Sequence, residues 1–157
     1  MPDNTVTIYC DGLCEPRNPG GHACYGWVAY NDQSDPNPAA MDSGCVGHGE
    51  GMTNNVAEYH AVIRALIWAY KEGYTEVLIR TDSQLVVNQV EGLWSCNAPN
   101  LHRLLGRVRG AQKYINLRME WIPRERNEEA DTLSRYAYKQ VTGQEAPVRE
   151  KPQTARR

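Results

Sequence analysis

The stretch that decides the fold is Thr5-Val-Thr-Ile-Tyr-Cys-Asp-Gly12, close to the start of the chain. Val6, Ile8 and Cys10 alternate with Thr5, Thr7 and Tyr9, which is the period of a β-strand. The strand is expected to end at Asp11-Gly12 and so to deliver a carboxylate to its own C-terminal edge. Asp-Gly after a strand is, on its own, more typical of a turn. A function for Asp11 therefore depends on what else reaches the same edge.

The rest of the chain predicts a mixed sheet around this strand. Strands over 22–30 and 41–46 follow at short spacing, so we expect an antiparallel meander because no crossover helix fits between them. A helix over 53–71 and an apolar strand over 75–81 then indicate a right-handed crossover, which sets the new strand beside the first. The remaining predicted elements are a short helix from 82 to 92, a helix over 100–114, a strand around 117–121 and a helix from 127 to 141. The expected fold class is α/β, with a mixed five-stranded sheet flanked by helices.

Length and composition predict one folded domain followed by a polar tail. The chain has 157 residues, 41% of them hydrophobic, which is enough for one core. No apolar run is long enough to cross a bilayer and the first residues are polar, so we expect a cytoplasmic protein with no membrane partner. Residues 1–141 form the predicted domain, and residues 142–157 a predicted disordered, basic tail. The sequence implies no obligatory protein partner, so a monomer is expected.

Charge and cysteine content say less about the function of the chain. A net charge of −2 argues against binding nucleic acid by charge alone. Five cysteines form no Cys-x-x-Cys pair, and Cys10, Cys14, His22 and Cys24 fit no common zinc-finger spacing, so we interpret the thiols as buried or incidental and leave a disulfide open. A basic run, which a solvated helix face would explain equally well, consists of Arg103, Arg107, Arg109, Lys113, Arg118, Arg124 and Arg126.

Three further acids have backbone settings comparable to that of Asp11. Glu58 lies in the first turn of a helix, where a capping box with Asn55 is the plainer explanation. Asp82 follows the second apolar strand, where it could simply cap a helix, but parallel neighbours would place it beside Asp11. Asp131 lies on the inner side of the first turn of the last helix, where the helix dipole favours any acid.

One shared site explains the four acids better than four independent roles as helix caps and turn residues. Clustered carboxylates repel and raise one another's pKa values unless cations lie among them. Mg²⁺ and Mn²⁺, hard ions that take oxygen ligands, are the natural occupants. A carboxylate cage with no dedicated nucleophile suits two-metal phosphodiester hydrolysis, with the ions roughly 3.5–4 Å apart.

The motifs occur in a recognisable order: Tyr-Cys-Asp11-Gly with Asn18-Pro-Gly, Thr53-Asn-Asn-x-x-Glu58, Thr81-Asp82-Ser-Gln84 and Asn127-x-x-Ala-Asp131. With them the chain resembles type 1 ribonuclease H over roughly residues 5–140. The resemblance implies a ribonuclease H-like fold and endonucleolytic cleavage of the RNA strand of an RNA–DNA hybrid, leaving 5′-phosphate and 3′-hydroxyl ends. It also implies that Asp11, Glu58, Asp82 and Asp131 are catalytic metal ligands.

The same resemblance implies contacts with the nucleic acid, several of them at the minor groove. Amides suit this task because they both donate and accept hydrogen bonds, as does the 2′-hydroxyl that distinguishes RNA from DNA. The implied substrate-binding residues are Cys14, Asn18, Thr53, Asn54, Asn55, Ser83, Gln84, Arg124 and Asn127.

The chain departs from the family pattern in two segments. Many members carry a histidine between the last strand and the last helix, but residues 122–127 hold none, so Arg124 or Glu125 is a candidate substitute. The basic helical protrusion of many bacterial members also has no counterpart, since residues 93–99 are few and contain no Lys or Arg. Affinity for the substrate would then be weaker, or would come from Arg103, Arg107 and the basic tail.

Two alternative functions stay open at this point. A non-catalytic module that binds hybrids would not need the complete set of acids, which is present here. A sister nuclease of the same superfamily that acts on DNA would share the acids, but Thr53-Asn54-Asn55 and Gln84 would have no 2′-hydroxyl to read.

Overall fold

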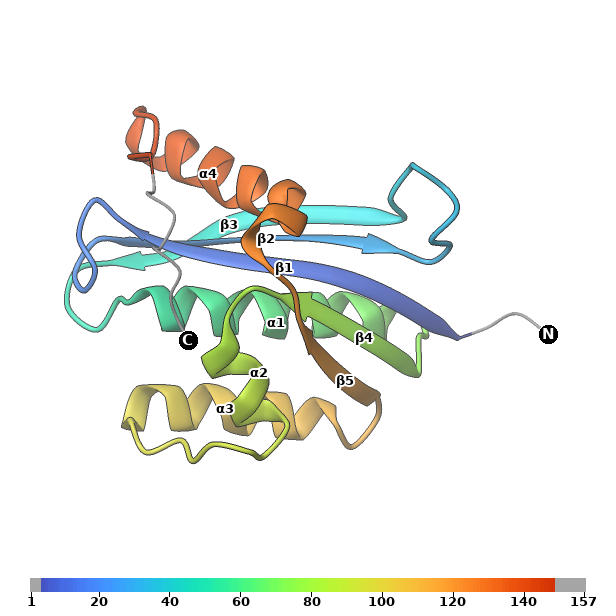
Figure 1. The fold of residues 1–157 in the computed structure, drawn as a ribbon. Helices are drawn as coiled ribbons and strands as arrows, with labels where there is room; N and C mark the ends of the chain where they lie inside the picture. Colours follow the sequence, from blue (N-terminus) through green and yellow to red (C-terminus); the bar gives the residue numbers. More distant parts are fainter. Residues whose placement is uncertain (1–3, 149–157) are drawn as a thin grey trace.

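The computed structural model describes residues 4–148, and a five-stranded sheet with the order β3-β2-β1-β4-β5 forms its centre (Figure 1). The first three strands are antiparallel neighbours, as their short connections predict. Their bounds are β1 Thr5–Glu15, β2 His22–Tyr30 and β3 Ala40–His48.

β1 is longer than the sequence predicts. It continues through Asp11 and Gly12 to Glu15, because these residues keep pairing with the first half of β2, as far as Glu15 with His22. The expectation that Asp11-Gly12 ends the strand is therefore wrong. An apolar–polar alternation cannot reveal this extension, since Asp11 itself and the segment after it are buried in the sheet.

Two parallel strands complete the sheet. β4 (Glu76–Thr81) pairs with β1, and β5 (Asn116–Trp121) pairs with β4. The ladder between β1 and β4 stops at the pair Cys10 and Thr81, although β1 continues alongside β2. The residues directly after this last pair consequently lie next to each other, at a point in the middle of β1.

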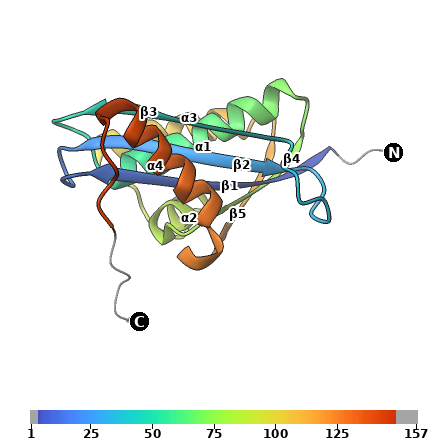
Figure 2. The same ribbon diagram turned by 90° about the horizontal axis from the view of Figure 1, so that it is seen from above.

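The longest helix, α1 (Asn54–Lys71), covers one face of the sheet. Its N-cap is Thr53, whose Oγ1 accepts a hydrogen bond from the backbone N–H of Val56 at 3.1 Å. Thr53, and not the Asn55 that the sequence offered as the N-cap of a capping box with Glu58, therefore caps this helix. Figure 2 shows α1 and α4 (Glu128–Thr142) on opposite sides of the sheet.

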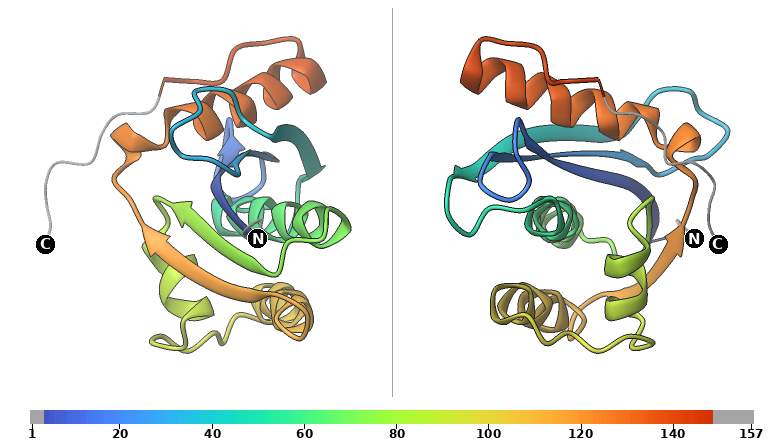
Figure 3. Two further views of the ribbon diagram at one scale, coloured as in Figure 1. Left: turned by 90° about the vertical axis from the view of Figure 1, so that its right-hand side faces the viewer. Right: turned by 60° about the vertical axis from the view of Figure 1, so that its left-hand side comes forward.

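Two helices lie beyond α1 and beside the edge of the sheet. α2 (Gln84–Val90) begins after Ser83, whose Oγ accepts from the N–H of Val86 at 3.2 Å, so Ser83 and not Asp82 caps this helix. α3 (Pro99–Ala111) packs against α1, and Figure 3 shows the two helices side by side with α1 nearer the sheet. Residues 91–98 connect α2 directly to α3.

The segment after α4 returns to the domain. Ala146 is buried in a small apolar cluster with the C-terminal half of α4, and the Nη1 group of Arg135 donates to the carbonyls of Ala146 and Pro147 at 3.4 and 3.2 Å. The predicted tail, 142–157, thus includes residues that pack on the domain, while 149–157 lie outside the described residues. Within residues 4–148, no helix has both the length and the apolar character needed to cross a bilayer.

A disulfide joins Cys24 of β2 to Cys45 of β3, a pairing that the sequence left open. Cys24 is therefore not available as a zinc ligand. Cys10, Cys14 and Cys96 are free thiols.

Removing this disulfide is expected to lower the free energy of unfolding by about 3 kcal/mol, because a bridge that closes a loop of this length restricts the unfolded chain. Urea unfolding of the Cys24→Ala/Cys45→Ala variant measures the loss, with Cys96→Ser as the free-thiol control. A reducing agent should shift the unfolding midpoint of the wild type and leave that of the double variant unchanged. Equal sensitivity of both proteins to reductant would contradict the assignment.

Candidate active site

Three carboxylates meet where β1 and β4 stop pairing. One oxygen from each of Asp11, Glu58 and Asp82 lies within 4.8 Å of the other two. Asp11 directly follows Cys10 and Asp82 directly follows Thr81, the last paired residues of the two parallel strands. The register of the sheet alone therefore places these two acids side by side, at the kind of strand edge where α/β proteins hold ligands.

Glu58 reaches the same point from the first turns of α1, because that helix lies unusually close to β1. A Cβ atom added to Gly12 would lie 2.5 Å from the backbone nitrogen of Glu58 and 2.6 Å from the carbonyl carbon of Ala57. Gly12 is thus needed for the approach of the helix and not, as its sequence context suggested, for a turn. Thr81 Oγ1 lies 3.5 Å from the Glu58 carboxylate and donates to it across the site.

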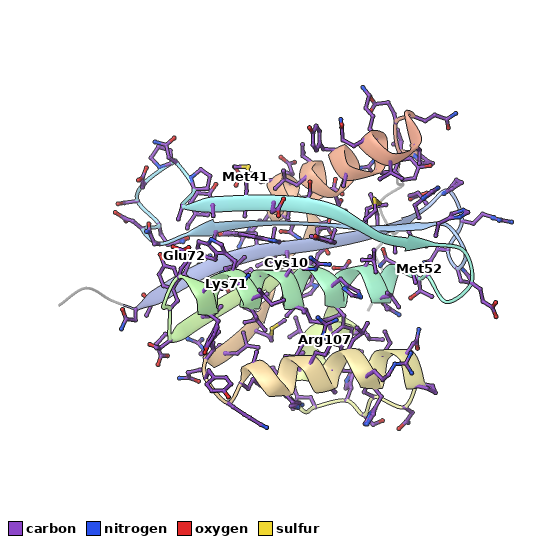
Figure 4. The ribbon with its side chains drawn as sticks, turned by 180° about the vertical axis from the view of Figure 1, so that it is seen from behind. Cys10, Met41, Met52, Lys71, Glu72 and Arg107 are labelled. Atoms are coloured by element: carbon purple, nitrogen blue, oxygen red, sulfur yellow. A yellow bond between two sulfur atoms is a disulfide. The ribbon has the colours of Figure 1, made fainter. Side chains whose placement is uncertain are left out.

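The three carboxylates differ in burial. Asp11 is fully buried and Glu58 is 3% exposed, whereas the Asp82 side chain reaches the rim at 10%. Figure 4 shows Cys10 between α1 and the sheet. Burial raises the pKa of the Cys10 thiol well above its usual range, and the Glu58 and Asp11 carboxylates raise it further, so this thiol stays protonated.

The donor set fits a hard divalent cation. Asp11, Glu58 and Asp82 offer carboxylate oxygens from three separate elements, and Mg²⁺ and Mn²⁺ prefer such ligands. Carboxylates held this close disfavour one another's charged forms unless a cation offsets the repulsion. The three acids are therefore better explained as a cation site than as unrelated caps.

Asp131, the fourth acid that the sequence singled out, does not belong to this group of three. It lies in the first turn of α4, with its side chain 24% exposed, and its Oδ2 pairs with the Arg135 Nε at 3.2 Å. As the sequence indicated, Asp131 lies beside the buried Ala130 and is less exposed than Glu128 and Glu129. A role for Asp131 as a metal ligand stays a prediction.

Asn127 holds the start of α4 on β1. Its Nδ2 donates to the Cys10 carbonyl at 2.8 Å, and the residue is 1% exposed. The side chain makes no capping hydrogen bond to α4. We therefore assign Asn127 a positioning role beside Asp11, and the substrate contact expected from the sequence stays a prediction.

Asp82 is contacted by two residues at and just after the end of β5. The Arg124 Nε lies 3.7 Å from Asp82 Oδ2, and the Trp121 Nε1 donates to the Asp82 carbonyl at 3.3 Å. Arg124 begins a short 3₁₀ helix, η1 (Arg124–Arg126), which connects β5 to α4. Glu125 instead lines a separate cavity with Tyr9 and other residues, so Arg124 is the better candidate for the place of the missing histidine. The sequence carried no signal for the contact from Trp121.

The predicted substrate-binding residues flank the three acids in two groups. Asn18 belongs to the loop after β1, where its Oδ1 accepts from the backbone N–H of Asn54 at 3.0 Å. Cys14 is buried, and its Sγ donates to the carbonyls of Arg17 and Met52 at 3.1 and 3.6 Å, so it supports this loop from below. The residues that lie at the surface or half-buried around the starts of α1 and α2 are Thr53, Asn54, Asn55, Ser83 and Gln84.

Comparison with known proteins identifies the family. Residues 10–137 match the family described as reverse transcriptase-like. Ribonuclease HI of Halobacterium salinarum is 38% identical over 136 residues, which cover 84% of this chain and 63% of that protein. The crystal structure of RNase H1 from the same archaeon is 35% identical with a TM-score of 0.77, and the match covers 87% of this chain and 98% of that one. This chain belongs to the type 1 ribonuclease H family.

Other solved members of the ribonuclease H family have structures similar to this one. The N-terminal RNase H domain of Rv2228c from Mycobacterium tuberculosis is 34% identical with a TM-score of 0.79, covering 88% of this chain and 96% of that one. LC11-RNase H1, solved in complex with an RNA/DNA hybrid, is 32% identical with a TM-score of 0.78, and the match covers 87% of this chain and 98% of that one. The ribonuclease H-like fold predicted from the sequence is confirmed. The chain spans only 34% of the full bifunctional protein Rv2228c.

Proposed function

We propose that this protein is an endoribonuclease that hydrolyses the RNA strand of RNA–DNA hybrids and leaves 5′-phosphate and 3′-hydroxyl ends. The observation that carries the proposal is the group formed by Asp11, Glu58 and Asp82 at the end of the β1–β4 ladder. The name of the Halobacterium relative, ribonuclease HI, and the hybrid complex of LC11-RNase H1 support it.

In this proposal the three grouped acids hold Mg²⁺ or Mn²⁺, two ions when the substrate is bound, and Asp131 joins them as a fourth ligand. Ions bound there would supply an activated water and stabilisation of the leaving oxygen. Burial of Asp11 and Glu58 fixes their oxygens in advance, so little reorganisation is needed when charge develops in the transition state. Asp82 is more exposed, and its contacts with Trp121 and Arg124 restrict its position in the same way.

Selection of RNA is assigned to the amides that flank the acids. With its oxygen committed to the N–H of Asn54, the Asn18 side chain offers its NH₂ group as a donor to a sugar or phosphate oxygen. Asn55 and Gln84 lie at the starts of α1 and α2, on either side of the acids. A 2′-hydroxyl can both donate to and accept from such amides, which a deoxyribose cannot do.

The Arg124→Ala variant is expected to cleave about tenfold to a hundredfold more slowly, the size of loss typical when a catalytic group loses its positioning partner. The loss should fall on kcat because Arg124 contacts the Asp82 carboxylate. Steady-state kinetics on a labelled hybrid measures it, with Arg124→Lys as a partial rescue and Glu125→Gln as the matched control. If Glu125→Gln were the more damaged variant, Arg124 would not be the substitute for the histidine.

A panel of duplexes of one sequence tests the proposed substrate. The RNA–DNA hybrid should be cut in its RNA strand in the presence of Mg²⁺ or Mn²⁺, and the DNA duplex and a four-way DNA junction should stay intact. Binding of the hybrid without cleavage would favour the non-catalytic module, and cleavage of DNA would favour the sister nuclease. Cytoplasmic location and a monomeric state stay predictions from the sequence.

A further inference from the structure

The segment that follows α4 is tied to that helix at Arg135. The Nη1 group of Arg135 donates to the carbonyls of Ala146 and Pro147 at 3.4 and 3.2 Å. Ala146 is 8% exposed and belongs to an apolar cluster with Tyr138 of α4 and Leu13 of β1. Figure 3 shows the segment running back beside α4. The packing of Ala146 therefore fixes the two carbonyls that receive the guanidinium group.

The same guanidinium group holds Asp131. The Arg135 Nε lies 3.2 Å from Asp131 Oδ2, one turn earlier on the helix, and the two side chains are only 28% and 24% exposed. A guanidinium presents its N–H donors in a rigid, planar fork. Because Nη1 contacts the two carbonyls, the segment after α4 also restricts the direction of Nε, and with it the position of the Asp131 carboxylate.

The part of α4 that carries Asp131 approaches the sheet beside Asp11. Gly26 of β2 pairs directly with Asp11, and a Cβ atom added to Gly26 would lie 2.6 Å from the carbonyl oxygen of Ala130. Asp11 shares a face of β1 with Leu13, which packs in the cluster with α4. Asp131 therefore follows a residue whose backbone lies against the sheet next to Asp11.

We infer that Arg135 is a positioning residue for Asp131 and that residues 143–148 keep Arg135 in place. The inference rests on the proposed function, in which Asp131 is a ligand of the metal ions. A carboxylate that binds a metal is itself held by hydrogen bonds, and loss of such a partner typically costs about tenfold to a hundredfold in metal affinity or activity. The segment after the last helix thus supports the catalytic centre.

Steady-state cleavage of a labelled hybrid by full-length variants tests the role of Arg135. At sub-saturating Mg²⁺, Arg135→Gln should lower kcat about tenfold and leave the KM for the hybrid unchanged, because Arg135 acts on a metal ligand and not on the substrate. Arg135→Lys should have an intermediate rate, since a lysine keeps the charge but has one nitrogen in place of the fork. A wild-type kcat for Arg135→Gln at every Mg²⁺ concentration would overturn the inference.

Ala146→Gln tests the segment without changing Arg135. Glutamine is too large and too polar for the buried position, so the segment should move off the helix and kcat should fall. The double variant should be no slower than Arg135→Gln alone, because both changes remove one shared contact. Losses that multiply in the double variant would contradict that contact. The control Lys139→Gln removes only an exposed ion pair with Glu145 and should keep the wild-type kcat.

Calorimetry with Mn²⁺ in the absence of a hybrid separates this inference from the proposed function. Arg135→Gln should bind Mn²⁺ about tenfold more weakly than the wild type, and Lys139→Gln should bind it as the wild type does. If the wild type did not cut the hybrid, the proposed function would fail, and the Mn²⁺ titration would still decide whether Arg135 supports the ion site. Cleavage by the wild type, with unchanged Mn²⁺ affinity and unchanged kcat in Arg135→Gln, would overturn the inference alone.

Discussion

The Asp11→Asn variant is expected to cleave an RNA–DNA hybrid at least about a thousandfold more slowly than the wild type. Metal ions stabilise the transition state by several kcal/mol, and about 4 kcal/mol corresponds to this factor. The substitution keeps the size of the side chain and removes only its charge, from a residue that is fully buried beside Glu58 and Asp82. Single-turnover kinetics at saturating enzyme measures the loss.

Stability separates this effect from misfolding. Removing one of three crowded carboxylates lowers their mutual repulsion, so the melting temperature of Asp11→Asn in the absence of metal should equal or exceed that of the wild type. Glu128→Gln, which alters an exposed acid of α4 outside the group, should retain normal activity. A rate for Asp11→Asn within tenfold of the wild type would show that Asp11 is not a catalytic ligand.

The Gly12→Ala variant is expected to lose about 3 kcal/mol of stability or more, and much of its activity, because it forces α1 away from β1. The added Cβ would lie 2.5 Å from the Glu58 nitrogen and 2.6 Å from the Ala57 carbonyl carbon, so backbone and not a flexible side chain has to move. That movement would also carry Glu58 away from Asp11. Urea unfolding measures the loss of stability.

Gly106 provides the matched control for Gly12. It lies inside α3, and a Cβ added there meets no atom within 4 Å. Gly106→Ala should therefore stabilise the protein by up to about 1 kcal/mol, the difference in helix propensity between the two residues. If Gly12→Ala unfolded at the urea concentration of the wild type, the close contact between α1 and β1 would not be a constraint on the fold.

Most of the fold could be predicted because its elements have regular periods and short or helical connections. The meander of β1, β2 and β3 and the parallel placement of β4 follow from loop length and crossover handedness. The extension of β1 to Glu15 could not be predicted, because it depends on the length of its partner β2. The disulfide likewise depends on which cysteines the β2–β3 register brings together.

Part of the candidate site was also predictable. The expected parallel pairing of β1 with β4 places Asp11 beside Asp82, although β1 does not end there, and Glu58 comes from α1, one turn later than expected. Gly12 was misinterpreted as a turn residue, because only the structure shows how near α1 comes. Asp131 lies outside that group of three and pairs with Arg135, four residues further along α4, so its role as a fourth ligand stays a prediction.

The remaining features that the sequence could not predict are contacts between residues far apart in the chain. Asn127 matches a family motif, so substrate binding was a reasonable expectation. Its bond to the carbonyl of Cys10 joins residues 117 positions apart. No local pattern encodes such a partner, and the same is true of the contact between Trp121 and Asp82.

A metal-dependent centre formed by Asp11, Glu58 and Asp82 for cutting RNA paired with DNA can be tested on one hybrid with a different label on each strand. The hybrid is incubated with wild-type protein and with the Asp82→Asn variant in a titration of Mg²⁺ or Mn²⁺. We expect that only the RNA strand is cut, that cutting rises with metal concentration, and that it is lost in the variant. Cutting of the RNA strand that persisted in a chelator, or in Asp82→Asn at the wild-type rate, would show that these acids are not a metal-dependent catalytic centre.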